Sequence, residues 1–140
     1  MGTNTNRKTG LKFEAELCQY FANYGWWATD LTQNAAGQPA DVMAVRCNTA
    51  VLIDCKVCSS DKFQLSRVEP NQVSAMKTWQ DRGNDYCYFA IKYPSGEIYM
   101  CQYDDYLFLT HENVSAIPEW YAKKVYRTFD NWIDYMEDMI

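Results

Sequence analysis

The segment from residue 50 to residue 57 is an apolar run that is interrupted by two charged side chains, Asp54 and Lys56. A short run of this kind, rich in β-branched residues, is typical of a strand buried inside a sheet. Side chains alternate across a strand, so Asp54 and Lys56 point to one face and their apolar neighbours to the other. On an exposed face the two would form an ion pair of little energetic value. In a central strand they indicate a functional role, because a buried charge costs free energy unless it is compensated.

Asp41 opens the strand that is predicted just before this run, after a Gln38-Pro39-Ala40 turn. A tight Asn48-Thr49 turn joins the two strands as a hairpin, which can bring Asp41 beside Asp54. Two carboxylates with an open side suit Mg²⁺, which binds a few hard oxygen ligands together with water. Lys56, next to such a metal, could orient an attacking water or stabilise a phosphate. The pattern therefore predicts metal-dependent hydrolysis of a phosphodiester.

Glu14 lies in a predicted helix that runs from Thr9 to about Tyr24, with apolar residues at helical spacing. The helix would have to pack across the sheet for Glu14 to reach the two aspartates, and the alternative is an ordinary surface glutamate. Glu16 competes for the same role, but it points about 200° around the helix from Glu14. Only one of the two can face the site.

The remaining periodicity predicts one α/β domain, which suits a chain of 140 residues. We expect a central mixed sheet flanked by helices. The predicted order is a helix at 9–24, strands at 26–32, 41–47 and 50–57 with a loop at 33–39, a helix at 70–82, and strands at 86–92 and 97–103. Residues 1–8 are expected to form a flexible basic arm and residues 9–140 the single domain. Its core would span about 9–103, and its mixed helical tail 104–140, with helices at 104–109 and 130–140.

The N-terminus and the six cysteines bear on the cellular compartment. The first eight residues lack the apolar core of a signal peptide, and no apolar stretch approaches the roughly 20 residues that span a membrane. We therefore expect a protein that is not secreted, has no membrane partner, and works in the cytoplasm of a bacterial or phage-infected cell, with its cysteines as free thiols. Cys55 and Cys58 have a spacing found in zinc sites. The sequence offers no second such pair and only one histidine, which favours buried thiols.

The formal net charge of −5 is unevenly distributed along the chain. Residues 1–92 carry ten Lys or Arg and nine Asp or Glu, whereas residues 93–140 carry three and nine. The near-neutral first segment is compatible with a nucleic-acid partner. Because the chain as a whole is acidic, we expect DNA binding to be weak and strongly salt-dependent.

Three motifs, Gly10-x-x-x-Glu14, Pro39-x-Asp41 and Asp54-x-Lys56, together resemble those of the PD-(D/E)xK nuclease superfamily. The resemblance covers about residues 8–92 and implies a restriction-endonuclease-like core in αβββαβ order. Within the superfamily, the chain resembles Holliday-junction resolvases of the RecU type. The likeness lies in the opening helix, in the thirteen-residue step from Asp41 to Asp54, and in the segment Phe63–Gln72. The chain departs from that type because it has no room for the long stalk insertion and is less basic.

This resemblance implies an Mg²⁺-dependent endodeoxyribonuclease, with Mn²⁺ as a substitute, that acts as a homodimer and makes paired nicks in four-way DNA junctions. Asp41, Asp54 and Glu14 would bind the metal, and Lys56 would assist hydrolysis. Gln72 would bond a metal-bound water or a phosphate. Contacts to DNA would come from five basic residues, namely Arg7, Lys8, Lys12, Lys62 and Arg67.

Two other functions remain open on the sequence. A restriction-like or repair nuclease acting on duplex or flapped DNA would use the same chemistry. A non-catalytic module that binds DNA or protein on a nuclease scaffold would suit the acidic tail, although it would not need all four motif residues. The aromatic residues of the tail fit either a dimer surface or core packing; they include Trp120, Tyr121, Trp132 and Tyr135.

Overall fold

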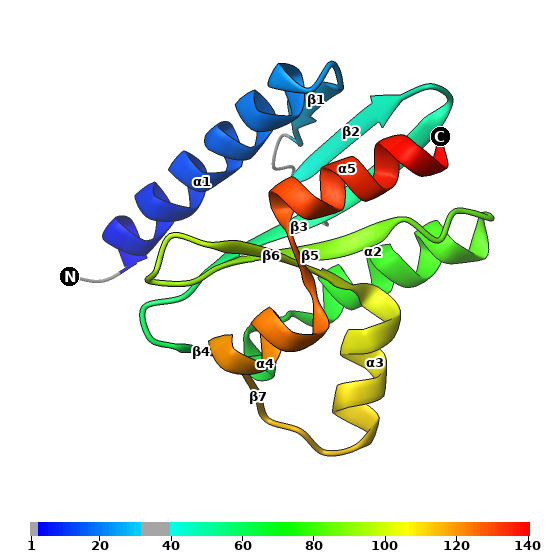
Figure 1. Ribbon diagram of the computed structural model, residues 1–140. Coiled ribbons are helices and arrows are strands. Elements are labelled where there is room, and N and C mark those ends of the chain that lie inside the picture. Colours follow the sequence, from blue (N-terminus) through cyan, green and yellow to red (C-terminus); the bar gives the residue numbers. More distant parts are fainter. Residues whose placement is uncertain (1–2, 32–39) are drawn as a thin grey trace.

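The computed structural model describes residues 3–31 and 40–140, with side chains from Lys8 onward. Within these residues, one mixed sheet of six strands forms the middle layer, with the strand order β1-β2-β3-β5-β6-β8 (Figure 1). The strands are β1 (Trp27–Asp30), β2 (Val42–Arg46), β3 (Thr49–Val57), β5 (Cys87–Lys92), β6 (Ile98–Gln102) and β8 (Arg127–Thr128). The α/β class and the central mixed sheet are as predicted.

Strand β3 occupies the middle of the sheet, as its apolar composition predicts. It pairs antiparallel with β2, with Val42 opposite Ile53, and parallel with β5, with Asp54 opposite Phe89. The hairpin turn consists of Cys47 and Asn48, at φ values of 50° and 65°. The predicted Asn48-Thr49 turn was therefore wrong by one residue. Positive φ at both central residues is typical of the type I′ turn, whose twist matches that of the paired strands.

Helices cover both faces of the sheet. One face packs against α1 (Thr3–Asn23) and α5 (Phe129–Met139), and the other against α2 (Pro70–Asp81), α3 (Tyr103–His111) and α4 (Glu119–Val125) (Figure 1). In α1, the buried side chains of Phe13, Leu17 and Phe21 recur every fourth residue and face the sheet. This periodicity fixes the side of α1 that lies over β3.

The predicted start of the first helix, at Thr9, was six residues too late. Backbone helix begins at Thr3, so most of the segment expected to be an arm is helical. The prediction failed because residues 3–8 have no apolar periodicity and include threonine and asparagine, which are weak helix formers. The helix at 70–82 is confirmed, and it stops before Gly83, at a φ of 100°. The predicted loop at 33–39 lies outside the described residues.

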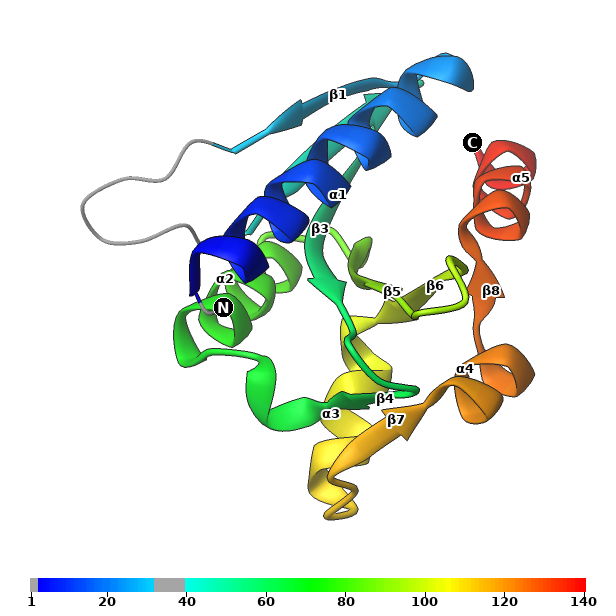
Figure 2. The ribbon, with the colours of Figure 1, turned by 90° about the vertical axis from the view of Figure 1, so that its left-hand side faces the viewer.

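Several short elements of the fold were not predicted from the sequence. Strands β4 (Lys62–Gln64) and β7 (Ala116–Pro118) form a separate two-stranded sheet, which Figure 2 shows away from the main sheet. A 3-10 turn, η1 (Leu65–Arg67), follows β4 directly. Phe63 and Ile117, each 1% exposed, lie opposite each other in this small sheet. The sheet therefore anchors the connection between β3 and α2.

The tail belongs to the same domain as the core. Its helices at 104–109 and 130–140 are confirmed as α3 and α5, whereas α4 and β8 were not predicted. Strand β8 pairs with β6, and α5 packs Phe129 and Trp132 against Phe21 of α1. Trp132 is thus a core residue, and Trp120, at 66% exposure, is the tail aromatic that reaches the surface most.

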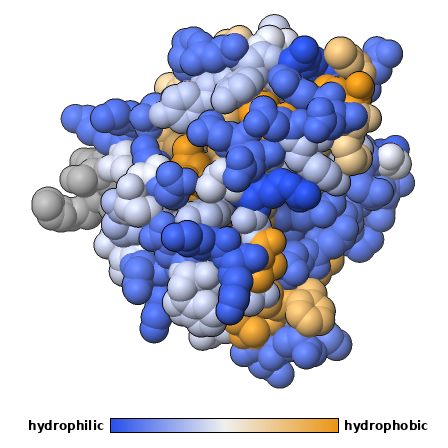
Figure 3. All heavy atoms as spheres, viewed as in Figure 1, coloured by the Kyte–Doolittle hydropathy of each residue, from blue (hydrophilic) through white to orange (hydrophobic). Residues whose placement is uncertain are grey.

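The face of the molecule seen in Figure 1 is largely hydrophilic. Figure 3 shows apolar side chains only in small, separate groups on the face seen in Figure 1. None of the described helices is both long enough and apolar enough to cross a membrane. All six cysteines are free thiols, as predicted, and Cys58, Cys87 and Cys101 are buried.

Candidate active site

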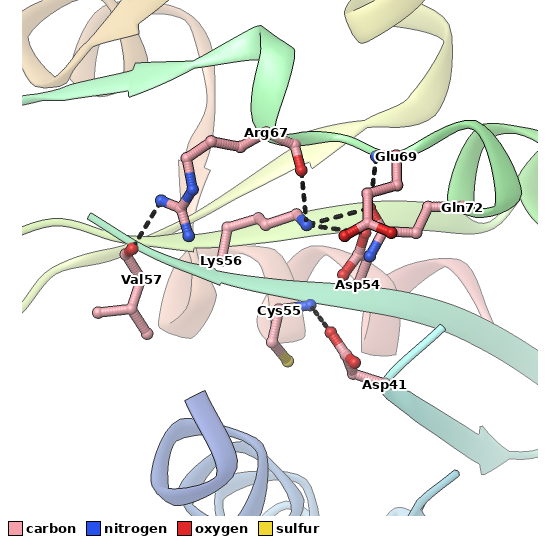
Figure 4. Close-up of polar contacts among 8 residues, drawn as sticks. All are labelled: Asp41, Asp54, Cys55, Lys56, Val57, Arg67, Glu69 and Gln72. Atoms are coloured by element: carbon pink, nitrogen blue, oxygen red, sulfur yellow. Dashed lines mark hydrogen bonds and ion pairs between the residues drawn. The ribbon is translucent and has the colours of Figure 1, made fainter. Parts of the chain in front are cut away.

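Asp54 and Lys56 are buried on the face of β3 that is covered by α2. Asp54 is 0% exposed and Lys56 is 7% exposed. The Lys56 ammonium nitrogen Nζ lies 3.6 Å from Oδ2 of Asp54, and Figure 4 shows both side chains on the same side of the strand. The prediction that they share one face of a central strand is confirmed.

Asp41 is bound to β3 through both its backbone and its side chain. Its amide donates to the carbonyl of Ile53 (3.0 Å), and its Oδ2 accepts from the amide of Cys55 (2.7 Å). The regular ladder between β2 and β3 ends at Val42, so the carboxylate serves as the acceptor for the next amide of β3. This contact fixes Asp41 beside the residue that follows Asp54, as the predicted hairpin required.

The two aspartates influence each other electrostatically. Burial raises the pKa of Asp54 well above its usual value, and a hydrogen bond and repulsion from Asp41 raise this pKa further, while Lys56 lowers it. The two carboxyl groups can hydrogen-bond each other only while one of them holds a proton. Both oxygens of Asp54 are buried, and the ammonium group of Lys56, 3.6 Å from Oδ2, is at the distance of an ion pair and not of a hydrogen bond. Asp54 is therefore a desolvated acceptor next to a second carboxylate.

Lys56 is oriented by acceptors from the segment between η1 and α2. Its Nζ donates to the backbone carbonyl of Arg67 (3.3 Å) and to Oε1 of Gln72 (3.1 Å). The same Gln72 oxygen accepts from the amide of Glu69 (2.9 Å) as part of the capping box that begins α2. The start of α2 and the ammonium group of Lys56 thus share one oxygen atom (Figure 4).

The choice between the two glutamates of α1 is clear. Glu14 is 8% exposed, and its charge raises the pKa of the Cys55 thiol, after the larger effects of burial, Asp41 and Asp54. Glu16 instead forms an ion pair with Lys92, with 3.2 Å between Nζ and Oε1. Glu14 therefore faces the sheet, but from the α1 side, opposite to the face that holds Asp54.

The predicted three-acid metal centre is assembled only in part. Over residues 3–31 and 40–140, no three His, Cys, Asp or Glu side chains are grouped closely enough to hold a metal ion. Asp41 and Asp54 come together, whereas Glu14 approaches the sheet from the α1 side. The pair itself fits a divalent cation, because hard carboxylate oxygens, a like-charged neighbour and the unsatisfied oxygens of Asp54 are all present.

The basic residues predicted to contact DNA differ in their surroundings. Lys8, Lys12 and Lys62 are exposed, whereas the side chain of Arg7 lies outside the described part of the chain. The guanidinium of Arg67 donates from Nη1 to the carbonyl of Val57 (2.7 Å) and lies 5.6 Å from the centre of the Phe63 ring. Arg67 is therefore engaged within the protein.

The structure adds roles that sequence reasoning missed. Glu69-Pro70-x-Gln72 has the spacing of a capping box with proline at the first helical position, so the helix start was readable from the sequence. The bond from Lys56 to the same Gln72 oxygen could not be predicted from the sequence, because it depends on how α2 packs on β3. The role of the Arg67 carbonyl as an acceptor for Lys56 could not be predicted either, because every residue has a carbonyl and only the fold determines which one lies near Lys56.

A central mixed sheet that carries buried Asp54 and Lys56 beside Asp41 defines a nuclease of the restriction-endonuclease-like class. Residues 5–119 match the family model of the archaeal Holliday junction resolvase (Hjc), and the chain belongs to this family. It is accordingly a Holliday junction resolvase-type, metal-dependent endonuclease. No curated protein sequence matches the chain.

A solved structure supports the same fold. The chain is similar to Archaeoglobus fulgidus Hjc, a Holliday junction resolvase from an archaeal hyperthermophile, at 1.6 Å resolution. The TM-score is 0.56 and the identity 19%, and the match covers 68% of this chain and 78% of the other. The comparisons confirm the resolvase class, with the archaeal family in place of the RecU type that the sequence resembled.

Proposed function

We propose that the chain is an Mg²⁺-dependent resolvase that makes paired nicks in four-way DNA junctions, with Asp41 and Asp54 as metal ligands and Lys56 as a catalytic residue. The observation that carries this proposal is the pair of unsatisfied Asp54 oxygens, buried beside a second carboxylate and an ammonium group. In a protein without such a site, this arrangement would be only a cost to stability.

A divalent metal in this position would polarise the scissile phosphate and lower the pKa of a bound water. The side chains supply the rest of the chemistry. Asp54 is held rigidly by β3, and Asp41 is fixed by the amide of Cys55. Lys56 presents a charge whose position is set by Arg67 and Gln72, so it can stabilise negative charge that develops on the phosphate without prior rearrangement.

Gln72 acts in this proposal mainly on Lys56. Its Oε1 already accepts two hydrogen bonds, from Lys56 and from the amide of Glu69. A direct contact with a phosphate or a water, as the family resemblance implied, would therefore have to use the amide nitrogen of Gln72.

Glu14 is proposed as an additional acid of the site. Its burial, at 8% exposure, and its contribution to the raised pKa of the Cys55 thiol support this proposal. Its substitution by glutamine tests this role, since loss of metal-dependent cleavage with unchanged folding would support it. Unchanged cleavage would assign Glu14 a purely structural role.

The DNA surface is proposed to include the exposed lysines Lys8, Lys12 and Lys62, together with Arg7. Such contacts to phosphates position DNA without reading its sequence. The two-residue turn between β2 and β3 leaves no stalk at this point, so junction selectivity would have to arise from the relative placement of two active sites. We therefore propose a homodimer, which light scattering in solution tests directly.

Mg²⁺ as the physiological ion, with Mn²⁺ as its substitute, also belongs to this proposal. It is tested by comparing cleavage with Mg²⁺, Mn²⁺ and Ca²⁺. The expected location in the cytoplasm of a bacterial or phage-infected cell stays a prediction.

A labelled four-way junction, incubated with Mg²⁺, provides the decisive test. We expect cleavage by the wild type and its loss in Lys56→Ala. Lys77→Ala is the matched control, because Lys77 is exposed and its ion pair, with Asp81 (2.9 Å), does not involve the residues of the site. Retained cleavage in Lys56→Ala would remove the proposed mechanism. Equal rates on linear duplex, flapped DNA and the junction would favour the duplex or repair function, and binding without any cleavage would favour the non-catalytic module.

A further inference from the structure

Arg67 forms hydrogen bonds with two consecutive residues of β3, one through its side chain and one through its backbone. Its guanidinium donates to the carbonyl of Val57 (2.7 Å), and its own carbonyl accepts from Nζ of Lys56 (3.3 Å). Figure 4 shows both bonds on the same side of the strand. The two contacts tie Arg67 both to the tip of the Lys56 side chain and to the backbone of the next residue, Val57.

The guanidinium is also fixed in direction. It lies 5.6 Å from the centre of the ring of Phe63, whose side chain is 1% exposed and paired into the small sheet of β4 and β7. A planar guanidinium over an aromatic ring, bonded to a carbonyl, has little freedom to reach toward a phosphate. The side chain thus serves a contact inside the protein although the residue is exposed.

The segment that holds Lys56 depends on this contact. Leu65–Arg67 is a single 3-10 turn between a three-residue strand and α2. The turn supplies the Arg67 carbonyl, and the helix that follows supplies the Gln72 oxygen. The guanidinium bond to Val57 is a direct side-chain tie between this turn and β3.

We infer that Arg67 is a positioning residue, which sets the orientation of the Lys56 ammonium group by locking the η1 turn onto the end of β3. This inference rests on the proposed catalytic role of Lys56. It replaces the DNA contact that the sequence predicted for Arg67. Its energetic effect is therefore on the rate of cleavage and not on the affinity for DNA.

The test separates rate from affinity. The dissociation constant for a labelled four-way junction is measured at several salt concentrations without Mg²⁺, and the cleavage rate constant is measured with enzyme in saturating excess. For Arg67→Ala we expect the rate constant to fall about 10- to 100-fold, as for other residues that orient an active-site group. The dissociation constant and its salt dependence should stay those of the wild type.

A phosphate contact would give the opposite result. Affinity would then fall, the slope of its salt dependence would decrease by about 1, and the rate at saturation would be unchanged. Arg67→Lys adds a second criterion and covers a failure of the alanine variant to fold. Lysine keeps the charge but not the planar group, so we expect normal affinity with a reduced rate. A fully restored rate would overturn the inference.

Two further variants are measured in parallel. Lys123→Ala removes an exposed charge on α4 and should change neither quantity. Lys56→Ala separates a failure of the proposed function from a failure of the role inferred for Arg67. If Lys56→Ala retains the wild-type rate, the proposed function fails; if Lys56→Ala is inactive and Arg67→Ala cleaves normally, only the role of Arg67 fails.

Discussion

Substitution of Asp54 by asparagine should stabilise the metal-free protein while it abolishes cleavage. Asparagine has nearly the same shape, so the 0% exposed site is neither emptied nor overfilled. The change replaces the buried carboxylate beside Asp41 with a neutral group of the same size. The new amide group can also donate a hydrogen bond to Asp41.

The size of the expected stabilisation follows from the free-energy cost of the buried Asp54 carboxylate in the wild type. A buried acceptor without hydrogen bonds costs about 1–3 kcal/mol, and more when it is charged. We therefore expect Asp54→Asn to raise the free energy of unfolding by about 1–3 kcal/mol without metal, at a pH above the folded-state pKa of Asp54. In a domain of this size each kcal/mol corresponds to a rise in Tm of about 3–4 °C.

The effect has a defined pH dependence. Burial and Asp41 raise the pKa of Asp54 in the folded state above its ordinary value of 3.8. The folded protein therefore binds this proton more tightly than the unfolded chain, and wild-type stability falls as the pH rises from about 3.8 through the folded-state pKa. The advantage of Asp54→Asn should be absent below this window and complete above it.

Bound metal should make the wild type more stable than Asp54→Asn, which reverses their order of stability in EDTA. A ligand that binds only the folded state stabilises it by mass action, so Mg²⁺ should raise the Tm of the wild type and leave that of Asp54→Asn nearly unchanged. Thermal unfolding with EDTA or with Mg²⁺, at pH values from 3.5 to about 8, measures each term. A variant that is less stable than the wild type in EDTA, or that keeps the full Mg²⁺ shift, would refute the electrostatic account of Asp54.

Three further outcomes follow from other contacts. Gln72→Ala should slow cleavage about 10- to 100-fold and destabilise the protein by about 1 kcal/mol through loss of the capping box, which single-turnover assays and chemical denaturation check. Lys12→Ala and Lys62→Ala should each weaken junction binding and lower its salt slope by about 1, with an unchanged rate at saturating enzyme; an unchanged slope would remove that lysine from the DNA surface. Trp132→Ala should cost about 3–5 kcal/mol of stability, and a cost below about 1 kcal/mol would contradict its place in the core.

The parts of the site that lie within one hairpin were predictable from the sequence. Alternation along residues 50–57 placed Asp54 and Lys56 on one face, and the short connection to β2 brought Asp41 beside them. Both inferences use only local geometry, in which each residue determines the direction of the next. The turn was misplaced by one residue, because asparagine accepts positive φ equally well at either position of such a turn.

Contacts between elements were not predictable in the same way. The sequence predicts that only one of Glu14 and Glu16 faces the site. Which of them faces β3 depends on how α1 is rotated about its axis over the sheet. That rotation is set by Phe13, Leu17 and Phe21, whose burial is a property of the assembled core. The sequence could state that only one glutamate faces inward, and the packing decided which one.

The exposed basic residue Arg67 illustrates a second limit. An arginine beside a nuclease motif is reasonably predicted to contact phosphate, since arginine is common in that role. In the folded chain its guanidinium instead bonds Val57, and its carbonyl, which every residue has, accepts from Lys56. Side-chain type alone does not separate these roles.

The packing of the core also determines where the acidic tail lies. Its aromatic residues Phe129 and Trp132 complete the core beneath α1, while β8 continues the sheet beyond β6. Residues 120–140 lie beyond the part of the chain that matches the Hjc family model. The tail is therefore built into the domain itself, and its acidic residues on α5, such as the exposed Asp130, Asp134 and Asp138, lie across the sheet from Lys56 and its partners. Their repulsion of phosphate would favour approach of DNA from elsewhere on the molecule, which reconciles a net charge of −5 with a DNA-cleaving enzyme.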